Sequence, residues 1–191
     1  MKRQEDRKTI RKYGISGREA LSETDRIQFS SAISEKIAAS AEFRHARIIL
    51  IYKGIKGEVR LDELERVAET EGKKIAFPLC ISKTEMIALV PDGPDCWKKG
   101  AYGIMEPIRE TSAEILPEEI DLVICPCTAF DEKCNRMGMG GGYYDRFLPG
   151  CINADIAAAA FEVQKVELVP REPHDRVMDK VFTEERVYSR N

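Results

Sequence analysis

Short apolar runs of strand length recur along the chain, and this recurrence constrains the fold more than any other feature of the sequence. Residues 47–52 read RIILIY, and residues 121–125 read DLVIC. Runs that are rich in β-branched residues and lack polar alternation are typical of strands buried on both faces of a sheet. Further strands are predicted at 74–79, 85–90, 154–161 and, as a short one, 177–182. Pro78 is expected to end the first of these further strands.

Helical segments separate these runs. Ser22 has the position of an N-cap, because acidic residues follow it and an apolar stripe then begins. Another helix is predicted from Leu61 to Gly72, a residue typical of helix C-caps. The alternation of strands and helices predicts an α/β domain with a largely parallel sheet, and no linker divides the chain. The stripe after Ser22 consists of Ile27, Ile33, Ile37 and Ala41.

The charge pattern argues against several classes of protein. The net charge of −3 gives no overall attraction to nucleic acid, although basic residues gather near the start. A charged helix is predicted up to about Lys12, because Arg3, Arg7 and Arg11 are spaced four residues apart and share one face. No apolar run approaches the ~20 residues that span a bilayer, and the charged beginning lacks the apolar core of a signal peptide. We therefore expect a cytoplasmic protein that binds neither nucleic acid nor membrane.

The six cysteines are expected to be reduced thiols, because the chain is long enough to bury a core without disulfides. Cys125-Pro-Cys127 lacks the CxxC spacing of zinc sites, and the chain has two histidines. A structural zinc site is therefore not expected.

Two loops are expected to meet in one crevice. Residues 54–60 (GIKGEVR) follow the strand at 47–52, and residues 126–142 (PCTAFDEKCNRMGMGGG) follow the strand at 121–125. In an open α/β sheet, ligands bind beyond the carboxyl ends of the parallel strands. The loops therefore become the leading candidates for a functional site.

The glycine cluster at 138–142 is the main motif in the second loop. Such clusters are most often flexible turns, and this one matches neither the P-loop nor the GxGxxG fingerprint. It follows a buried strand, however, and precedes a predicted helix at 143–148, so its amide groups could converge on an anion. Arg136 offers a bidentate donor to phosphate, and Asp145 offers a carboxylate to Mg²⁺. The phosphate-binding interpretation is favoured.

Several motifs in order resemble the 5-formyltetrahydrofolate cyclo-ligase family, whose members are also called 5,10-methenyltetrahydrofolate synthetases. Residues 129–131 (AFD) and 135–148 (NRMGMGGGYYDRFL) are similar to its signature, and the resemblance extends over nearly the whole chain. It implies a three-layer α/β/α sandwich, related to the sugar-phosphate isomerase and CoA-transferase group, formed by a single domain over 1–191. Shorter matching stretches lie at 57–59, 72–78, 103–107, 160–164 and 174–175.

The resemblance implies an ATP- and Mg²⁺-dependent ring closure. The formyl oxygen of 5-formyltetrahydrofolate would accept the γ-phosphoryl group of ATP, since an amide-like formyl group is otherwise a poor electrophile. N10 of the folate would then attack the activated carbon, giving 5,10-methenyltetrahydrofolate, ADP and phosphate. Such a reaction depends on positioning and charge stabilisation and needs no protein nucleophile.

The resemblance also implies which residues bind the folate and act in catalysis. Arg136 and Tyr144 would be the catalytic residues. Glu58 would bind the N–H groups of the pterin, and Met139 and Tyr143 would complete the folate site. The folate is expected with or without a polyglutamate tail. An ordinary loop carboxylate remains the alternative for Glu58.

Nucleotide and metal positions follow from the same resemblance. Asp145 would hold magnesium, with Asp175 as the second metal residue. The spacing of basic residues in the opening helix varies within the family, so the register that brings Lys8 or Arg7 to the nucleotide is open. The expected ATP-binding residues are Arg7, Lys8, Arg11, Arg136, Gly138, Gly140, Gly141, Gly142, Tyr143 and Tyr144.

Two departures from the family pattern keep other functions open. Cys134 stands where glycine is usual, which would distort the loop if that position has a positive φ. Leu61 stands where threonine is common, so a polar contact to folate would be missing. The alternatives are a non-catalytic folate- or nucleotide-binding relative, an RNA-binding protein and a sugar-phosphate isomerase. The protein is expected to be a monomer or a weak homodimer.

Overall fold

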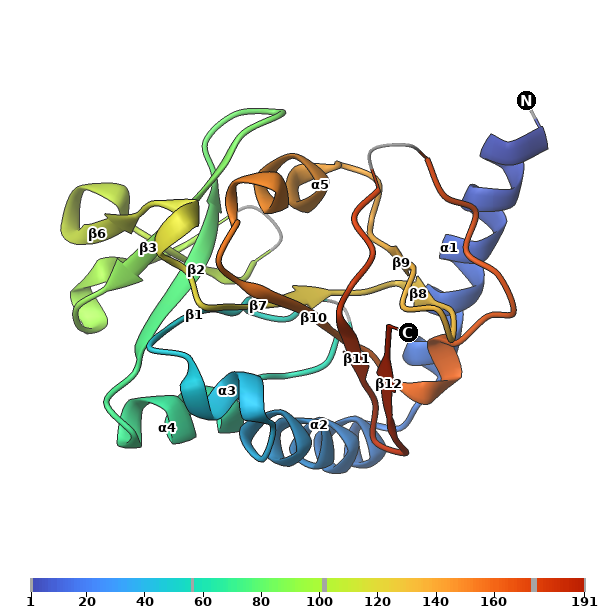
Figure 1. The fold of residues 1–191 in the computed structure, drawn as a ribbon, viewed down its shortest axis with the longest axis horizontal. Helices are drawn as coiled ribbons and strands as arrows, with labels where there is room; N and C mark the ends of the chain where they lie inside the picture. Colours follow the sequence, from blue (N-terminus) through green and yellow to red (C-terminus); the bar gives the residue numbers. More distant parts are fainter. Residues whose placement is uncertain (1, 56, 101–102, 173–174, 191) are drawn as a thin grey trace.

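The computed structural model describes residues 2–55, 57–100, 103–172 and 175–190, without the side chains of residues 2–5. Its centre is an eight-stranded sheet in the order β12-β11-β10-β7-β1-β2-β3-β6 (Figure 1). The strands from β11 to β2 in this order are parallel, whereas β12, β3 and β6 join antiparallel. The predicted α/β domain with a mostly parallel sheet is confirmed.

The sheet strands, with bounds in chain order, are β1 (Ile48–Leu50), β2 (Lys74–Cys80), β3 (Met86–Pro91), β6 (Ser112–Ile115), β7 (Leu122–Pro126), β10 (Asp155–Ala159), β11 (Lys180–Phe182) and β12 (Val187–Ser189). Two small hairpins pair β4 (Trp97–Lys99) with β5 (Met105–Pro107), and β8 (Ala129–Phe130) with β9 (Arg136–Met137). The α-helices are α1 (Lys2–Ala20), α2 (Glu23–Ala38), α3 (Ala41–His45), α4 (Asp62–Thr70) and α5 (Tyr143–Phe147). The short 3₁₀ turns are η1 (Pro94–Cys96), η2 (Arg109–Thr111), η3 (Pro117–Glu119), η4 (Leu148–Gly150) and η5 (Glu162–Gln164).

Each face of the sheet is buried under its own hydrophobic layer. Alternate residues of β7 point to opposite faces: Leu122 and Ile124 join one core cluster, and Val123 and Cys125 join the other. Helices α2, α3 and α4 cover the first face, while the short α5 lies on the opposite face (Figure 1). This arrangement gives the three layers, and burial on both faces explains the continuous apolar runs of the central strands.

The predicted strands all form, but Pro78 does not end its strand. It lies inside β2 and is paired with Ala88 of β3. The even-numbered positions of β2 face β1, since the Lys74 N–H donates to the Arg47 carbonyl and the Ala76 carbonyl accepts from Ile51. Because β1 has ended beside Pro78, the missing N–H of the proline faces no strand partner, and the strand can continue.

The predicted helices also form, with corrections at their apolar stripes and ends. The Ser22 hydroxyl accepts the Asp25 N–H at 3.0 Å, which confirms the N-cap of α2. Ile33 and Ile37 are fully buried, but Ile27 is 51% exposed and Ala41 begins α3, so the stripe is shorter than expected. The C-terminal glycine after α4 is confirmed, because Gly72 adopts φ +70°.

Helix α1 is longer than predicted and packs against segments from the second half of the chain. It continues past Lys12 to Ala20 and contacts β8 and η5 (Figure 1). Two glycines allow this contact: a Cβ on Gly14 would lie 1.8 Å from the Thr128 carbonyl oxygen, and one on Gly17 would lie 2.8 Å from Val163. The prediction that Arg3 shares the basic face lies outside the described side chains.

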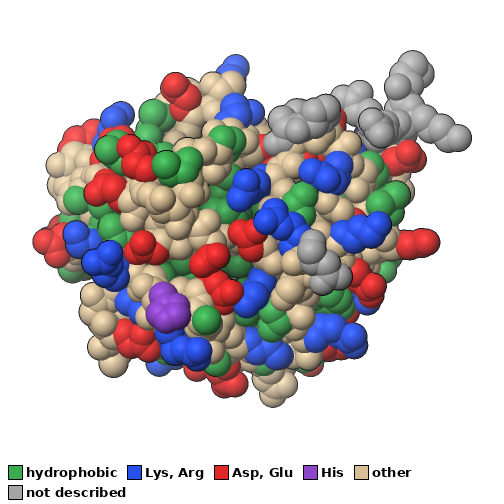
Figure 2. Space-filling model, in the orientation of Figure 1, with side chains coloured by type: hydrophobic (Ala, Val, Ile, Leu, Met, Phe, Trp, Pro, Cys, Tyr) green, Lys and Arg blue, Asp and Glu red, His purple; other side chains and the backbone are tan. Residues whose placement is uncertain are grey.

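Acidic and basic side chains are interspersed over the face seen in Figure 2, in line with the small net charge. Within the part of the chain that the structure describes, no helix has both the length and the apolar character needed to cross a membrane.

We predict that Gly14→Ala destabilises the protein even though alanine favours helices. The gain in helix propensity of about 1 kcal/mol is outweighed by overpacking against the Thr128 carbonyl, giving a net loss of about 1–2 kcal/mol. Urea unfolding followed by circular dichroism measures this loss. The control is Ser16→Ala, at an exposed position of the same helix, which should be neutral or stabilising. Equal stability of the two variants would contradict the close packing of α1.

Candidate active site

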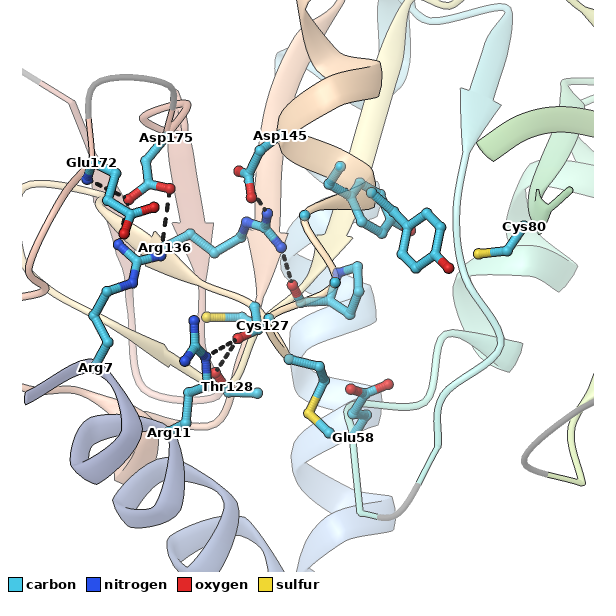
Figure 3. Close-up of a pocket in the computed structure, with 18 residues that line it drawn as sticks. Arg7, Arg11, Glu58, Cys80, Cys127, Thr128, Arg136, Asp145, Glu172 and Asp175 are labelled. Carbon is cyan, nitrogen blue, oxygen red and sulfur yellow. Dashed lines mark hydrogen bonds and ion pairs between the residues drawn. The ribbon is translucent and has the colours of Figure 1, made fainter. Parts of the chain in front are cut away.

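A pocket of about 390 Å³ lies beyond the carboxyl ends of β1 and β7, where the two predicted loops meet (Figure 3). The loop after β1 contributes Glu58, and the loop after β7 contributes the glycine cluster. Helix α1 adds arginines from one side, and Cys80 at the end of β2 closes another (Figure 3). The residues lining the pocket are Arg7, Arg11, Glu58, Cys80, Pro126, Cys127, Thr128, Arg136, Gly138, Met139, Gly140, Gly141, Gly142, Tyr143, Tyr144, Asp145, Glu172 and Asp175.

The glycine segment is held by a short hairpin rather than by a long open loop. Strands β8 and β9 pair Phe130 with Arg136, and Asp131 fastens the turn between them. The Asp131 carboxylate accepts the N–H groups of Asn135 at 3.1 Å and Val169 at 3.0 Å, as well as the Asn135 side-chain amide. Asp131 thus has an Asx-type role, and it fixes where β9 places Arg136.

Cys134, which stands where glycine is usual in the family, has a positive φ. This is the condition under which the substitution was expected to distort the loop. Its φ is +60°, and it is the one non-glycine residue with positive φ in the described ranges. A side chain in this region costs on the order of 1 kcal/mol relative to glycine. The hairpin keeps its register nevertheless, because the Cys134 N–H donates to Asp131 and its carbonyl accepts from Met178. The strain therefore leaves the path of the glycine segment intact.

Two glycines of the cluster need the backbone freedom that only glycine has at low cost. Gly140 has φ +104° and Gly142 has φ +67°, and Gly142 is the residue just before α5. The Arg11 guanidinium lies about 3.5 Å from the Cβ position of Gly140 and donates from Nε to the Gly138 carbonyl at 3.0 Å. The segment thus bends around Arg11 and leaves its backbone facing the pocket.

Arg136 lies at the centre of the pocket with its guanidinium buried. It donates to the Pro126 carbonyl at 2.9 Å and to the Asp145 carboxylate at 3.3 Å (Figure 3). Its Nε has no hydrogen-bond partner in the part of the chain that the structure describes. The guanidinium also lies 5.4 Å from the centre of the Tyr144 ring. A buried cation with a long ion pair and an unused donor is suited to an anionic ligand.

Arg7 and Asp175 form a second ion pair on the opposite wall. Arg7 Nη1 lies 2.6 Å from Asp175 Oδ2 and donates to the Pro170 carbonyl at 2.7 Å. Asp175 also accepts the Glu172 N–H at 2.7 Å. Its carboxylate is therefore more extensively bonded than that of Asp145.

Glu58 is buried at the inner end of the pocket and is bonded on both oxygens. Oε2 accepts the Ile55 N–H at 3.1 Å, and Oε1 accepts from the guanidinium of Arg18 at 3.2 Å. Burial raises the pKa of Glu58 above its usual value, while the charge of Arg18 opposes that rise. The carboxylate thus faces the pocket from a site of low polarity.

The two tyrosines occupy different environments. The Tyr143 hydroxyl donates to the Ser82 carbonyl at 3.1 Å, which ties α5 to the turn between β2 and β3. The Tyr144 hydroxyl is buried without a hydrogen-bond partner, and burial raises its pKa well above the usual value. Met139 is exposed within the pocket.

All the predicted site residues except Lys8 line this one pocket. Lys8 is exposed on α1, so the helix presents Arg7 and Arg11 to the pocket instead. Leu61 is buried at the N-cap position of α4, makes no side-chain cap and does not line the pocket. Leucine in place of the family's threonine therefore removes a helix cap and not a pocket contact. Sequence analysis assigned no site role to the pocket residues Cys80, Pro126, Cys127, Thr128 and Glu172 or to the buried Arg18, although Pro126, Cys127 and Thr128 lie in the predicted loop at 126–142.

The pocket contains both carboxylates and arginines, so it offers ligands for a metal ion and for phosphate groups. Within the described residues, no three histidine, cysteine or acidic side chains cluster so as to hold a metal ion. Asp145 and Asp175 instead each face an arginine across the same cavity. Mg²⁺ is commonly held by one or two carboxylates together with phosphate oxygens and water, so this donor set fits it.

Comparison with known proteins agrees with the geometry. The sequence profile of the 5-formyltetrahydrofolate cyclo-ligase family matches residues 3–184. This chain belongs to that family. The Haemophilus influenzae 5-formyltetrahydrofolate cyclo-ligase is 31% identical over 91% of the chain and 93% of its own length, and the Mus musculus one is 26% identical over 87% of each.

Solved structures agree with the fold of this family member. The Aquifex aeolicus 5,10-methenyltetrahydrofolate synthetase superposes with a TM-score of 0.84 at 31% identity, covering 96% of this chain and 92% of the other. The Mycoplasma pneumoniae 5,10-methenyltetrahydrofolate synthetase has a TM-score of 0.77 at 25% identity, covering 94% and 99%. The family and the fold predicted from the sequence are therefore confirmed.

We predict that a thiol reagent modifies one cysteine quickly in the folded protein at pH 8, and that this is Cys80. Cys80 is exposed and lines the pocket, so it is expected to react first even though burial also raises its pKa. The other five cysteines are buried, and burial raises the pKa of Cys125 and Cys127 to about 12 and that of Cys134 and Cys151 to about 11. Intact mass spectrometry counts the modified thiols, and ligands of the pocket should slow the reaction.

The control for thiol modification is Cys80→Ser, which should remove the fast reaction. Rapid modification of a second cysteine in the folded protein would contradict the burial described above.

Proposed function

We propose that the protein catalyses the ATP-dependent closure of 5-formyltetrahydrofolate to 5,10-methenyltetrahydrofolate, with release of ADP and phosphate. The observation that carries this proposal is the single pocket in which a buried arginine, a glycine segment and a buried glutamate from the other loop face one another. An ATP-dependent ligation of this kind needs a phosphate site and a folate site side by side. Membership of the cyclo-ligase family supports the same reaction.

The ATP phosphates would occupy the side of the pocket formed by Arg11, Arg136 and the glycines at 138–142. Arg136 has an unused Nε donor and a long pair to Asp145, so phosphate oxygens would replace this carboxylate as its main partner. The charge that develops on the transferred phosphoryl group would lie beside the buried guanidinium, where electrostatic stabilisation is strong. Arg136 is thus the proposed catalytic cation.

Magnesium would be held by Asp145, with Asp175 as the second acidic side chain. Asp145 is the better placed of the two, since its bond to Arg136 is long and its side chain is partly exposed. Asp175 would stay bonded to Arg7 and orient it toward the phosphates. When bound, the ion neutralises charge on the phosphates and fixes their geometry.

The folate would bind with its pterin at Glu58, because a carboxylate pairs with adjacent N–H donors. Tyr143 and Met139 would flank it, and Tyr144 would lie beside the reacting formyl group close to Arg136. A neutral hydroxyl with a raised pKa can donate a hydrogen bond to the former formyl oxygen as it leaves with the phosphate, the step in which negative charge develops on it. The chain would thereby bind and orient both substrates while the substrates supply the reacting atoms.

We further propose that the protein acts in the cytoplasm as a monomer or weak homodimer, on folates with or without a polyglutamate tail. A non-catalytic relative is less well supported, because Cys134 and Leu61 leave the pocket side chains in place.

The direct test incubates the purified protein with 5-formyltetrahydrofolate, ATP and Mg²⁺ and follows the absorbance of the methenyl product. We expect one product for each ATP consumed, and none when ATP is left out. Well-folded protein that forms no ATP-dependent product would sink the proposal in favour of a binding role.

A crossed pair of substitutions tests the assignment of the two loops. Arg136→Gln should raise the KM for ATP by about tenfold or more, since it removes a charge-assisted hydrogen bond, while Glu58→Gln should chiefly raise the KM for the folate. Lys133→Gln and Glu69→Gln are matched exposed controls and should change neither constant. If Glu58→Gln raised the KM for ATP and left the KM for the folate unchanged, the assignment of the two loops would be reversed.

A further inference from the structure

Arg18 is a buried cation whose hydrogen bonds go to one pocket residue and to the backbone beside it. It lies near the C-terminal end of α1, beyond the segment whose arginines line the pocket. Its Nη1 donates to Glu58 Oε1 at 3.2 Å and to the Cys127 carbonyl at 3.3 Å. The side chain is 0% exposed. Arg18 therefore faces Glu58 from behind the pocket wall and does not itself reach a ligand in the cavity.

This position is costly for a residue with only a structural task. Among the described residues, the Nε and Nη2 groups of Arg18 are buried without hydrogen-bond partners. A buried arginine with unused donors destabilises the fold compared with an apolar side chain of similar size, so folding alone does not account for it. What the guanidinium gives in return is a positive charge next to a carboxylate whose pKa burial raises.

The other titratable groups that face Glu58 carry no charge near neutral pH. They are Tyr52, which follows β1, Cys127, which follows β7, and Tyr144 of α5. Burial raises the pKa of both tyrosines well above the usual value and that of Cys127 to about 12, so all three remain protonated. Lys56 of the Glu58 loop lies outside the described residues. Within the described environment, Arg18 is therefore the charged group that favours the ionised form of Glu58, and the Ile55 N–H is the neutral donor beside it.

We propose that Arg18 is a positioning residue that keeps Glu58 ionised and turned toward the folate. The proposal rests on the folate-binding role proposed above for Glu58. A carboxylate accepts N–H donors through both oxygens, whereas a protonated carboxyl group offers one of its oxygens as a donor and would oppose the pterin N–H groups. Arg18 would thus determine the lowest pH at which the folate site works.

The sign of the effect follows from linkage between protonation and binding. If the folate binds the ionised form, its affinity is constant above the pKa of Glu58 and falls about tenfold for each pH unit below it. Loss of Arg18 removes the largest interaction that opposes the burial-driven rise in this pKa and leaves the Ile55 N–H bond. The midpoint of the affinity profile would therefore move to higher pH, while ATP affinity would keep its own profile.

The experiment measures the dissociation constant of 5-formyltetrahydrofolate by titration calorimetry from pH 5 to pH 9 for the full chain. We expect Arg18→Met to move the midpoint upward by at least one pH unit, which is tenfold weaker binding below both midpoints. Arg18→Lys keeps a charge but lacks the planar fork, so its midpoint should lie between those of the unsubstituted protein and Arg18→Met. ATP binding by the same variants is the control and should stay unchanged.

Double substitution separates positioning from a general structural effect. In the Glu58→Gln background the pH dependence should disappear, and adding Arg18→Met should weaken folate binding no further. An unshifted midpoint in a folded Arg18 variant, or an equal further loss in the Glu58→Gln background, would overturn the proposal. Failure of Glu58→Gln itself to affect folate binding would instead count against the proposed folate site.

Arg18→Gln provides a second neutral variant if Arg18→Met does not fold, and circular dichroism establishes folding for each. If neither neutral variant folds, Arg18→Lys carries the test. Its midpoint should still lie above that of the unsubstituted protein, because the guanidinium hydrogen bond is lost, and an unchanged midpoint would contradict the proposal.

Discussion

The site depends on the close approach of α1 to the backbone that follows β7. Gly14 lets the helix lie directly against the Thr128 carbonyl, and Gly17 does the same at Val163. One helix can then deliver Arg7 and Arg11 to the pocket wall and Arg18 behind it, because these residues lie on either side of the contact. A larger residue at Gly14 would displace all three cations together. The chemistry of the pocket is therefore set by a packing constraint.

Three arginines in or behind the pocket each have a carboxylate counterpart from another segment. Arg7 pairs with Asp175, Arg136 with Asp145, and Arg18 with Glu58. Such pairs keep the cations oriented when no ligand is bound. A bound phosphate could replace the carboxylate partner of an arginine, and pterin N–H groups could bind a carboxylate beside its arginine. Because the pairs are largely buried, salt screens them less than it screens the exposed pairs on the surface.

The sequence predicted the central strands, the two crevice loops and nearly the whole pocket, because buried parallel strands and glycine-rich turns leave strong local patterns. It could not predict that Pro78 continues a strand, since that depends on where the neighbouring strand ends. The register of α1 also stayed open, as spacing alone fits either Lys8 or Arg7. Arg18 was missed for a related reason: a buried arginine is recognised only by the carboxylate it meets across the fold.

The pair between Arg7 and Asp175 joins residues 168 positions apart in the chain. Loop closure over such a distance is slow compared with the formation of local helices and hairpins. During synthesis, α1 leaves the ribosome before Asp175 and acquires this partner only after almost every strand of the sheet has been made. Completion of the pocket is thus one of the last events in folding, so a truncated or stalled chain holds its basic helix without the acidic partner that orients it.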